Sequence, residues 1–524
     1  MSIKVLSDLP QKPLTIKRAL LSVSNKDQLI PLAKTLHESG VEIISTGGTA
    51  KVISDTGIPV KDVSEITQFD ECLDGRVKTL HPNVHAGILA RTSYQPDVDE
   101  LDKLDISPIE LVVANLYPFK KTIQKDDCTL AEAVEYIDIG GPTMVRAAAK
   151  NFAHVCILTD PSQYEDFINK LKENKTISFE SRKQLARAAF NHTAEYDTTI
   201  ANYFNDLYDE TTPPQLNVSF PKSQELRYGE NPHQMAAVYG NQKEYIDCFH
   251  GKQLSYNNYN DIDSALNLIA DFETSEPTCA IFKHTVPSGV AKAESLEQAY
   301  RKAFQTDTMS PFGGIVIVNK KLDLNTARAI DEIFTEIIIA PEYEEEALEL
   351  LKKKANRRLI RQTKSVKSKK SITFRSIFGG SLFQDADHRL VNEDELKIVT
   401  KRKPTDQEYK DLIFAWKIVK HVKSNAIVYV SDNMTLGIGS GQTSRIDSSE
   451  IAIAKAKKFE LDLQGSAIAS DAFFPFADGV EAAAKAGATA VIQPGGSIRD
   501  NEVIEMADKH NMTMLFTGIR HFKH

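Results

Sequence analysis

The sequence lacks three features that would assign it at once to a specialised class of protein. No stretch approaches the roughly 18 apolar residues of a membrane-spanning helix, and the N-terminus has no apolar core of a secretion signal. The five cysteines are scattered, and no two have the CxxC spacing of a zinc knuckle or redox dithiol. Positive charge is not in excess, because 63 Lys and Arg residues face 72 Asp and Glu residues, which gives a formal net charge of −9. We therefore expect a soluble, cytoplasmic protein with reduced thiols and without a nucleic-acid or membrane partner.

The composition that is present is typical of globular proteins, with 41% hydrophobic and 26% charged residues. The length of 524 residues predicts about three to four domains. Short β-branched runs alternate with helical patterns, which predicts an α/β fold with parallel βαβ units. In the first half the expected strands are residues 19–23, 41–45, 111–115 and 154–158, with helices at 26–39 and 50–55.

The second half of the chain continues the α/β pattern, with expected strands at residues 279–282, 314–318, 426–430 and 488–492. A polar segment with three prolines at 211–222 predicts a linker between domains at residues 1–210 and 223–524. Two proline turns, SPFGG at 310–314 and SDAFFPF at 470–476, echo each other and suggest an internal duplication.

Two polar loops of the first half, SVSNK at 22–26 and STGGT at 45–49, each follow an expected strand. The carboxyl ends of parallel strands meet at one sheet edge, so the loops converge. Glycines allow close backbone approach, helix N-termini bind anions and Lys26 adds a positive charge. The pair predicts a phosphate site without the Walker A pattern, although either loop alone also fits a plain turn.

A third motif, GRVKTLHPNVHAG at 75–87, supplies Arg76, Lys78 and Thr79 as donors to a phosphate or carboxylate. His81 and His85 have helical ligand spacing, but without a third ligand we expect structural histidines. Further motifs are NLYPF at 115–119, IDIGG at 137–141 and RAAAK at 146–150, and each also fits a structural role. These residues predict an anion-binding α/β domain with Lys and Tyr available as acid–base groups.

In the second half the most informative motif is FKHTVPSG at 282–289. Lys283 and His284 are adjacent at the end of an expected strand, and the following proline and glycine predict that both side chains enter one pocket. A nearby ammonium favours the neutral imidazole that a general base requires. The motif LRYGENPHQ at 226–234 fits a phosphate and base contact or a capped turn equally well. The glycine-rich run at 437–445 lacks the dinucleotide fingerprint, which disfavours NAD.

Residues 352–370 include ten basic and no acidic residues, and they follow an acidic run at 342–349. We expect a solvated helix and loop here rather than a nucleic-acid patch, because no aromatic residues are interleaved.

These motifs together closely resemble the bifunctional purine-biosynthesis family that combines AICAR transformylase with IMP cyclohydrolase, over essentially the whole chain. The resemblance implies a methylglyoxal-synthase-like first domain that closes the ring of formyl-AICAR to IMP. It implies a duplicated cytidine-deaminase-like second domain that transfers a formyl group from 10-formyltetrahydrofolate to AICAR. The zinc-binding cysteines of deaminases have no counterpart in the two proline turns, so no catalytic metal is expected. A homodimer with transformylase sites across the subunits is also implied, and residues 352–370 would contact polyglutamylated folate.

The resemblance also implies site residues in both halves. Lys150 would be the acid–base lysine of cyclisation, assisted by Lys78, Tyr117 and Asp138. The nucleotide contacts there would be Ser22, Ser24, Asn25, Lys26, Thr46, Gly47, Gly48, Thr49, Arg76, Val77, Thr79, Asn115 and Ile139. In the second half Lys283 and His284 would be catalytic. AICAR would be held by Arg227, Tyr228, Asn260, Asp263, Gly313, Glu336, Asn425, Arg445, Phe473 and Arg520, and folate by Phe312, Ile446, Asp478, Ser497 and Ile498.

Two other functions fit parts of this pattern. One is a single-activity cyclohydrolase whose second half only binds nucleotide, and the other is a non-catalytic nucleotide sensor. A sensor needs phosphate donors, but it has no need for Lys78, Tyr117, Asp138 and Lys150 together with the Lys283-His284 pair. This acid–base set favours the bifunctional enzyme.

Overall fold

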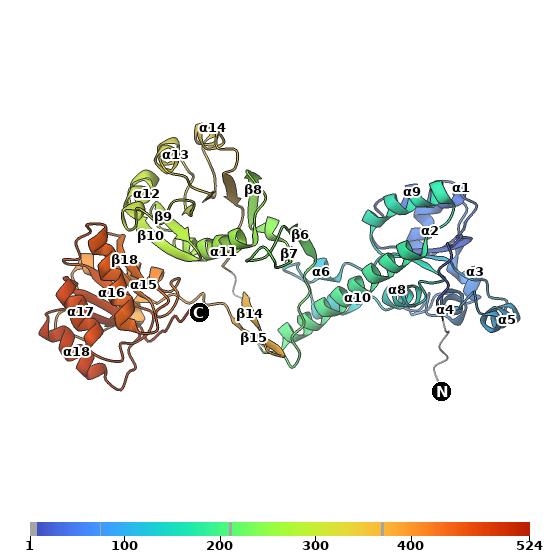
Figure 1. The fold of residues 1–524 in the computed structure, drawn as a ribbon. Coiled ribbons are helices and arrows are strands. Elements are labelled where there is room, and N and C mark those ends of the chain that lie inside the picture. The colour runs from blue at the N-terminus through green and yellow to red at the C-terminus, as the bar shows by residue number, and fades with distance from the viewer. Residues whose placement is uncertain (1–7, 74, 209–211, 368–370) are drawn as a thin grey trace. The chain divides into compact units, whose positions relative to one another are not determined.

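The computed structural model describes residues 8–73, 75–208, 212–367 and 371–524. The chain forms two compact units, Met1–Phe220 (unit 1) and Pro221–His524 (unit 2), each an α/β structure (Figure 1). The boundary between the units falls inside the segment 211–222, which the sequence predicts as a linker. The expected α/β fold class is confirmed. Within the described residues, no helix is both long and apolar enough to cross a membrane.

Unit 1 is built on a parallel sheet with the strand order β3-β2-β1-β4-β5. The strands are β1 Arg18–Ser22, β2 Glu42–Ser45, β3 Lys61–Asp62, β4 Leu111–Ala114 and β5 Cys156–Leu158. Side chains alternate between the two faces, so Leu20 and Leu21 enter different cores. The four strands expected in this half are confirmed.

Helices cover both faces of the unit 1 sheet. Apolar residues of α1, α2 and α9 pack on one face, and those of α3, α4, α8 and α10 pack on the other. The helices are α1 Leu29–Glu38, α2 Gly47–Ser54, α3 Val63–Thr67, α4 Pro82–Leu89, α5 Gln95–Lys103, α6 Phe119–Thr122, α7 Leu130–Glu135, α8 Gly140–Lys150, α9 Tyr164–Asn174 and α10 Phe179–Leu207.

Unit 2 contains a long mixed sheet with the order β16-β21-β20-β19-β17-β18-β10-β9-β11-β12-β13-β8. Its strands are β8 Ile246–His250, β9 Thr278–Lys283, β10 Val286–Lys292, β11 Ile315–Val318, β12 Ile337–Ala340, β13 Arg358–Gln362, β16 Lys397–Ile398, β17 Ile427–Ser431, β18 Met434–Gly439, β19 Ala467–Ser470, β20 Ala490–Gln493 and β21 Thr513–Phe516. Two small antiparallel sheets pair β6 Lys222–Leu226 with β7 Ala236–Tyr239, and β14 Ile372–Ile377 with β15 Gly380–Asp385.

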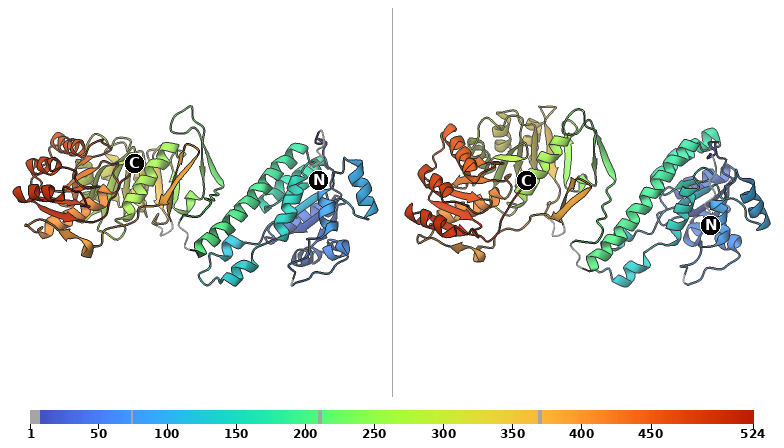
Figure 2. Two further views of the ribbon diagram at one scale, coloured as in Figure 1. Left: turned by 90° about the horizontal axis from the view of Figure 1, so that it is seen from below. Right: turned by 60° about the horizontal axis from the view of Figure 1, so that its bottom comes forward.

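The order of elements in unit 2 is an internal duplication. The first repeat, residues 256–362, runs α11-β9-β10-α12-β11-α13-β12-α14-β13, and the second, residues 406–516, runs α15-β17-β18-α16-β19-α17-β20-α18-β21. The sheet order is symmetrical about the β10–β18 pair, and the repeats occupy the green-yellow and orange-red parts of unit 2 (Figures 1 and 2). The helices are α11 Tyr256–Ala270, α12 Leu296–Gln305, α13 Leu324–Asp331, α14 Glu345–Leu351, α15 Asp406–Val419, α16 Arg445–Lys458, α17 Asp478–Ala486 and α18 Asp500–Lys509.

The two proline turns that suggested this duplication do not occupy equivalent positions. Residues 310–314 lie between α12 and β11, whereas residues 470–476 begin at the end of β19 and precede α17. The repeated order of elements establishes the duplication. The similarity between the two proline turns does not support it, because the turns have different places in the two repeats. A better marker is the start of α11 and α15, where Ser255 and Thr405 each form a capping box.

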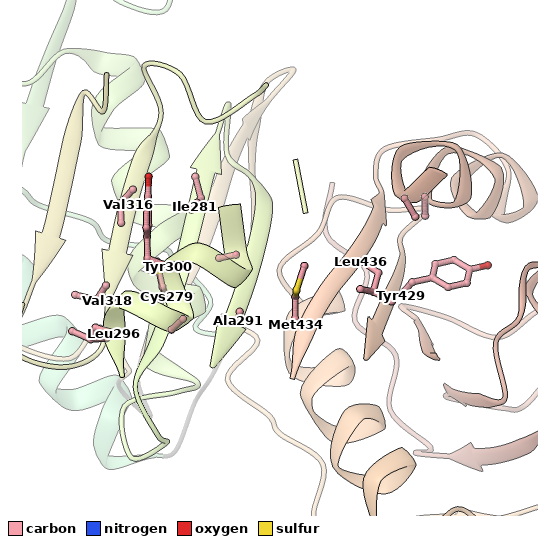
Figure 3. Packing of buried hydrophobic residues seen from close by; sticks show 14 of the residues in the cluster. Cys279, Ile281, Ala291, Leu296, Tyr300, Val316, Val318, Tyr429, Met434 and Leu436 are labelled. Atoms are coloured by element: carbon pink, nitrogen blue, oxygen red, sulfur yellow. The ribbon is translucent and has the colours of Figure 1, made fainter. Parts of the chain in front are cut away.

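Each face of the unit 2 sheet is buried by helices from both repeats. Helices α11 and α15 cover one face, and α12 to α14 with α16 to α18 cover the other. Figure 3 shows the hydrophobic core under α12 to α14 and α16 to α18, at the place where the two repeats meet. Ala291 of β10 lies opposite Met434 of β18 there. The repeats therefore share continuous hydrophobic cores.

A buried charge cluster also joins the repeats, where α11 and α15 end. Asp271, after α11, contacts the ammonium of Lys420 at 3.2 Å and the Nε2 of His421 at 2.7 Å, both just after α15. Lys367 contacts the other carboxylate oxygen of Asp271 at 2.8 Å. Burial lowers the pKa of His421 to about 4, so this imidazole is neutral at pH 7. The Asp271 carboxylate thus balances the buried Lys420.

We expect Asp271→Ala to lower the free energy of unfolding of unit 2 by about 3–5 kcal/mol, because Lys420 would be left buried without its partner. Trp416, the single tryptophan, is buried on α15, so its fluorescence during urea unfolding measures this change. Glu276→Ala is the control, because it removes an exposed carboxylate from its ion pair with the partly buried Lys292 and should cost at most about 1 kcal/mol. Equal losses for the two variants would contradict the expectation.

The basic segment at 352–370 is not the solvated helix and loop that its charge predicts. Residues 368–370 lie outside the described residues. The part that is described includes strand β13, and Arg357 and Arg358 are buried. Lys352 and Lys353 are exposed, whereas six other basic side chains form ion pairs with acidic residues elsewhere in unit 2, namely Asp247, Asp271, Glu244, Asp331 and Glu336. The prediction was wrong because these acidic partners lie far from the segment in sequence.

Candidate functional site

The first group of polar residues lies where β1, β2 and β4 end. Asn115, directly after β4, accepts the N–H groups of Ser24 at 2.6 Å and Asn25 at 2.9 Å through Oδ1. Its Nδ2 donates to the carbonyl of Asn25 at 2.9 Å. The SVSNK and NLYPF motifs are therefore held together by one amide side chain, as the topology of a parallel sheet predicts.

The STGGT motif joins the same edge. Ser22 and Thr46 share a hydrogen bond of 2.9 Å between their hydroxyls, and Thr49 donates to the carbonyl of Val23 at 3.0 Å. Helix α2 begins at Gly47, earlier than the predicted start at residue 50, so Gly47, Gly48 and Thr49 form its first turn. Helix α1 begins at Leu29, which leaves Lys26 exposed in a loop.

Lys78 connects the GRVKT motif to this loop. The Lys78 ammonium lies close to Gly47, 3.0 Å from where a Cβ atom on this residue would be. Gly47, Lys78 and residues 62–64 and 69–71 line a cleft of about 400 Å³. Lys78 forms an ion pair with Glu71, and Arg76 forms one with Glu135. The Arg76–Glu135 pair is exposed and Glu71 is exposed beside a partly buried Lys78, so an anionic ligand can compete for the two cations.

The glycine pair of IDIGG brings two more motifs together. A Cβ atom on Gly140 would lie 3.0 Å from the Thr79 hydroxyl, and one on Gly141 only 2.5 Å from the Asp138 carboxylate. Asp138 accepts the N–H of Gly141 at 2.8 Å, and the N–H of Tyr117 is 3.4 Å away. Burial raises the pKa of the Asp138 carboxyl. The side chain of Tyr117 and that of Ile139, the N-cap of α8, are both exposed.

Lys150 lies at the opposite end of helix α8 from Asp138. It is the last residue of α8, whereas Asp138 precedes the first. A helix rises 1.5 Å per residue, so about 16 Å separate the two ends. Val77 belongs to the GRVKT loop, where it pairs with Cys72.

The histidines of the third motif have local structural contacts. His81 caps α4, because its Nδ1 accepts the N–H of Asn83 at 3.2 Å. His85 lies within α4, and burial lowers its pKa. Among the described residues, no group of three or more His, Cys, Asp or Glu side chains is arranged to hold a metal ion.

The second site begins at the β9–β10 hairpin. Strand β9 ends at Lys283, as expected, and His284 and Thr285 form a two-residue turn before β10. The Lys283 ammonium donates to the carbonyl of Phe312 at 2.8 Å and lies 3.4 Å from where a Cβ on Gly313 would be. The SPFGG turn thus positions Lys283, while His284 and the Phe312 ring are exposed.

Glu336 is held beside this hairpin by two residues that are not among those expected from the sequence. Its carboxylate accepts from Arg358 at 2.8 Å and from Asn258 at 3.2 Å. Asp261 on α11 accepts the N–H of Thr285 at 2.6 Å. Asn260 and Asp263, which the family resemblance implies as site residues, flank Asp261 on the same helix. We refer to Lys283, His284, Phe312, Gly313 and Glu336 as cluster A.

A second group, cluster B, consists of Asn425, Arg445 and Phe473 in the second repeat. The Arg445 guanidinium donates to Asn425 at 3.0 Å, to Asp471 at 2.8 Å and to the carbonyl of Phe473 at 3.2 Å. In the described parts of the chain, no hydrogen bond or ion pair joins cluster B to cluster A.

The remaining predicted residues lie at separate places in unit 2. The Arg227 guanidinium lies 5.7 Å from the Tyr228 ring, and that of Arg520 lies 4.4 Å from the Phe522 ring. Ile446 and Asp478 lie in the first turns of α16 and α17. Ser497 accepts the N–H of Arg499 at 3.1 Å, and Ile498 is fully exposed.

Comparison with known proteins identifies the family. The model of the AICARFT/IMPCHase bienzyme matches residues 148–455, and that of the MGS-like domain matches residues 28–143. The bifunctional purine biosynthesis protein PurH of Chloroflexus aurantiacus is 52% identical over 510 residues, 97% of this chain and 99% of that protein. PurH of Bacillus mycoides is 50% identical over 516 residues, 97% of this chain and 100% of that protein. The chain therefore belongs to the AICARFT/IMPCHase family of bifunctional purine biosynthesis enzymes.

Proposed function

We propose that unit 2 transfers a formyl group from 10-formyltetrahydrofolate to the 5-amino group of AICAR, and that unit 1 closes the product, formyl-AICAR, to IMP and water. The observation that carries this division is that each unit has its own group of phosphate donors and acid–base side chains. Purified protein mixed with AICAR and 10-formyltetrahydrofolate should show the absorbance change of formyl transfer and yield IMP. Absence of turnover would reject the enzyme in favour of the sensor.

For cyclisation, the carboxamide nitrogen attacks a formyl carbon that is already attached to the same molecule, so much of the entropic cost is removed. The loops around Asn115 and Gly47 would hold the phosphate and ribose, and Lys78 would stabilise the developing oxyanion. Burial raises the pKa of the Asp138 carboxyl, which makes this group a better proton acceptor than an exposed carboxylate. Tyr117 lies beside it, and the role of Lys150 rests on the family resemblance alone.

We expect Lys78→Ala to reduce kcat/KM for cyclisation by about 10²-fold, because the ammonium acts on the reacting atoms. Formyl transfer in unit 2 should be unchanged. Separate assays with formyl-AICAR and with AICAR measure the two reactions. Lys34→Ala, which removes an exposed lysine of the same unit, is the control. Full cyclisation by Lys78→Ala would remove this lysine from the proposed site, and Lys150→Ala tests the other lysine in the same assay.

For formyl transfer, the AICAR amine is a poor nucleophile because its lone pair is delocalised into the ring. His284 accepts a proton from this amine as it attacks the formyl carbon. Lys283, aimed by the Phe312 carbonyl, stabilises the formyl oxyanion or protonates the departing folate nitrogen. Cluster B with Arg227, Tyr228, Asn260, Asp263, Glu336, Gly313 and Arg520 would hold AICAR. Phe312, Ile446, Asp478, Ser497 and Ile498 would line the folate side.

The protein would act as a homodimer in the cytoplasm, with clusters A and B of different subunits forming one transformylase site. The family resemblance implies this sharing of the site between two copies of the chain. The β14–β15 hairpin also exposes Phe374, Phe378 and Leu382, which suits burial against a partner. All five cysteines carry free thiols, which agrees with a reducing compartment.

A further inference from the structure

The turn that carries His284 has an unfavourable backbone conformation. His284 has a φ of 53° and Thr285 a φ of 62°, both in the left-handed region. Two-residue hairpin turns of this kind favour Asn, Asp and Gly. A β-branched residue such as Thr285 is a genuine outlier there. The surrounding structure must therefore hold this turn in place.

Asp261 is the side chain that contacts the turn. It lies on α11, half-buried, and its Oδ1 accepts the N–H of Thr285 at 2.6 Å. Burial raises the pKa of the Asp261 carboxyl, and the charges of His284 and Lys283 oppose that rise. The carboxyl group contacts the backbone directly after His284, and no hydrogen bond from it to the side chain of Lys283 or His284 is described.

The second repeat contains the same arrangement without the catalytic residues. The β17–β18 turn consists of Asp432 and Asn433, with φ values of 49° and 57°. Asp411 on α15 accepts their N–H groups at 3.2 Å and 2.9 Å. Asp261 and Asp411 occupy the same helical position, each six residues after the N-caps Ser255 and Thr405. The contact is therefore part of the duplicated fold.

We propose that Asp261 is a positioning residue for formyl transfer: by accepting the Thr285 N–H it holds the left-handed His284–Thr285 turn and presents the imidazole to the substrate amine. The inference rests on the proposed role of His284. The turn in the second repeat keeps residues that favour this conformation, whereas the turn in the first depends more strongly on its carboxylate. Displacement of a catalytic group by about 1 Å is enough to reduce a rate by about 10²-fold.

The test compares Asp261→Ala with Asp411→Ala, which removes the equivalent carboxylate far from any proposed reacting atom. We expect Asp261→Ala to lower kcat for formyl transfer by about 10²-fold, with the KM for AICAR changed by less than about threefold. Asp411→Ala should leave kcat unchanged. Asp261→Asn keeps a side-chain oxygen that accepts the N–H, so it should retain most of the activity. Cyclisation in unit 1 is the internal control.

Rescue tests whether the backbone of the turn is the cause. Thr285→Asn places in the first repeat a residue that favours the left-handed region, as Asn433 does in the second. We expect the kcat of Asp261→Ala/Thr285→Asn to be at least tenfold higher than that of Asp261→Ala. Unchanged kcat in Asp261→Ala, or equal losses in Asp261→Ala and Asp411→Ala, would overturn the proposal.

A second measurement separates this proposal from the role of His284. The ring signal of His284 in a histidine-labelled protein, assigned with His284→Gln, reports the conformation of the turn directly. It should shift or broaden in Asp261→Ala and return in the double variant. If the signal behaves in this way but His284→Ala retains full activity, the turn contact stands and the proposed catalytic role fails. An unchanged signal contradicts the positioning role itself.

Discussion

His284→Ala should reduce formyl transfer by about 10²- to 10⁴-fold, the range expected when a general acid–base group is removed. The imidazole is exposed at the tip of the β9–β10 turn, so its loss should not destabilise unit 2. The proton of the AICAR amine would then have no acceptor at the moment of attack. Initial rates with AICAR and 10-formyltetrahydrofolate measure this effect.

Cyclisation provides the internal control for His284→Ala. Unit 1 contains its own polar site, so the variant should close formyl-AICAR at the wild-type rate. His510→Ala, which removes an exposed histidine after α18, should leave both reactions unchanged. Near-normal formyl transfer by His284→Ala would remove this residue from the chemistry and leave Lys283 as the remaining candidate in the motif.

Mixing two inactive variants should restore formyl transfer if the site is shared between subunits. His284→Ala damages cluster A, and Arg445→Ala damages cluster B by removing the donor to Asn425 and to the Phe473 carbonyl. In a heterodimer of the two, one shared site combines both defects and the other is intact. Random reassociation makes about half of the dimers heterodimers, so about a quarter of wild-type activity should return.

The matched control for this experiment combines two variants of the same cluster. His284→Ala mixed with Lys283→Ala leaves a defect in every shared site, so no activity should return. Heterodimers isolated with two affinity tags make the comparison quantitative. If heterodimers of His284→Ala and Arg445→Ala form and stay inactive, the transformylase site lies within a single chain.

Much of the fold is predictable from the sequence, because the buried strands are short apolar runs that polar loops separate from the next element. The predicted strand at 111–115 corresponds to β4, and that at 279–282 to β9. Pairing across the centre of the unit 2 sheet is not predictable, because Ala291 and Met434 are distant in sequence. The duplication is visible in the order of elements, whereas the proline turns that suggested it have different places in the two repeats.

The loops of the candidate sites could be predicted because glycine, lysine and serine at strand ends have a direct chemical interpretation. The residues that support those loops could not. Asp261, Asn258 and Arg358 lie within a helix or a strand, where an isolated polar residue usually faces solvent. The signal for Asp261 was its match to Asp411 at the same distance from an N-cap, which is recognisable only once the repeats are aligned.

The doubled unit also bears on how such an enzyme evolves. When a gene segment is duplicated and fused, both copies stay under selection to fold, but only one copy of a given loop must serve chemistry. In this chain one hairpin turn retains Asp and Asn, the residues suited to its backbone, while the other carries His and Thr. The turn of the second repeat thus carries residues that suit its backbone conformation, whereas the turn of the first repeat carries residues that do not and is held by the contact from Asp261.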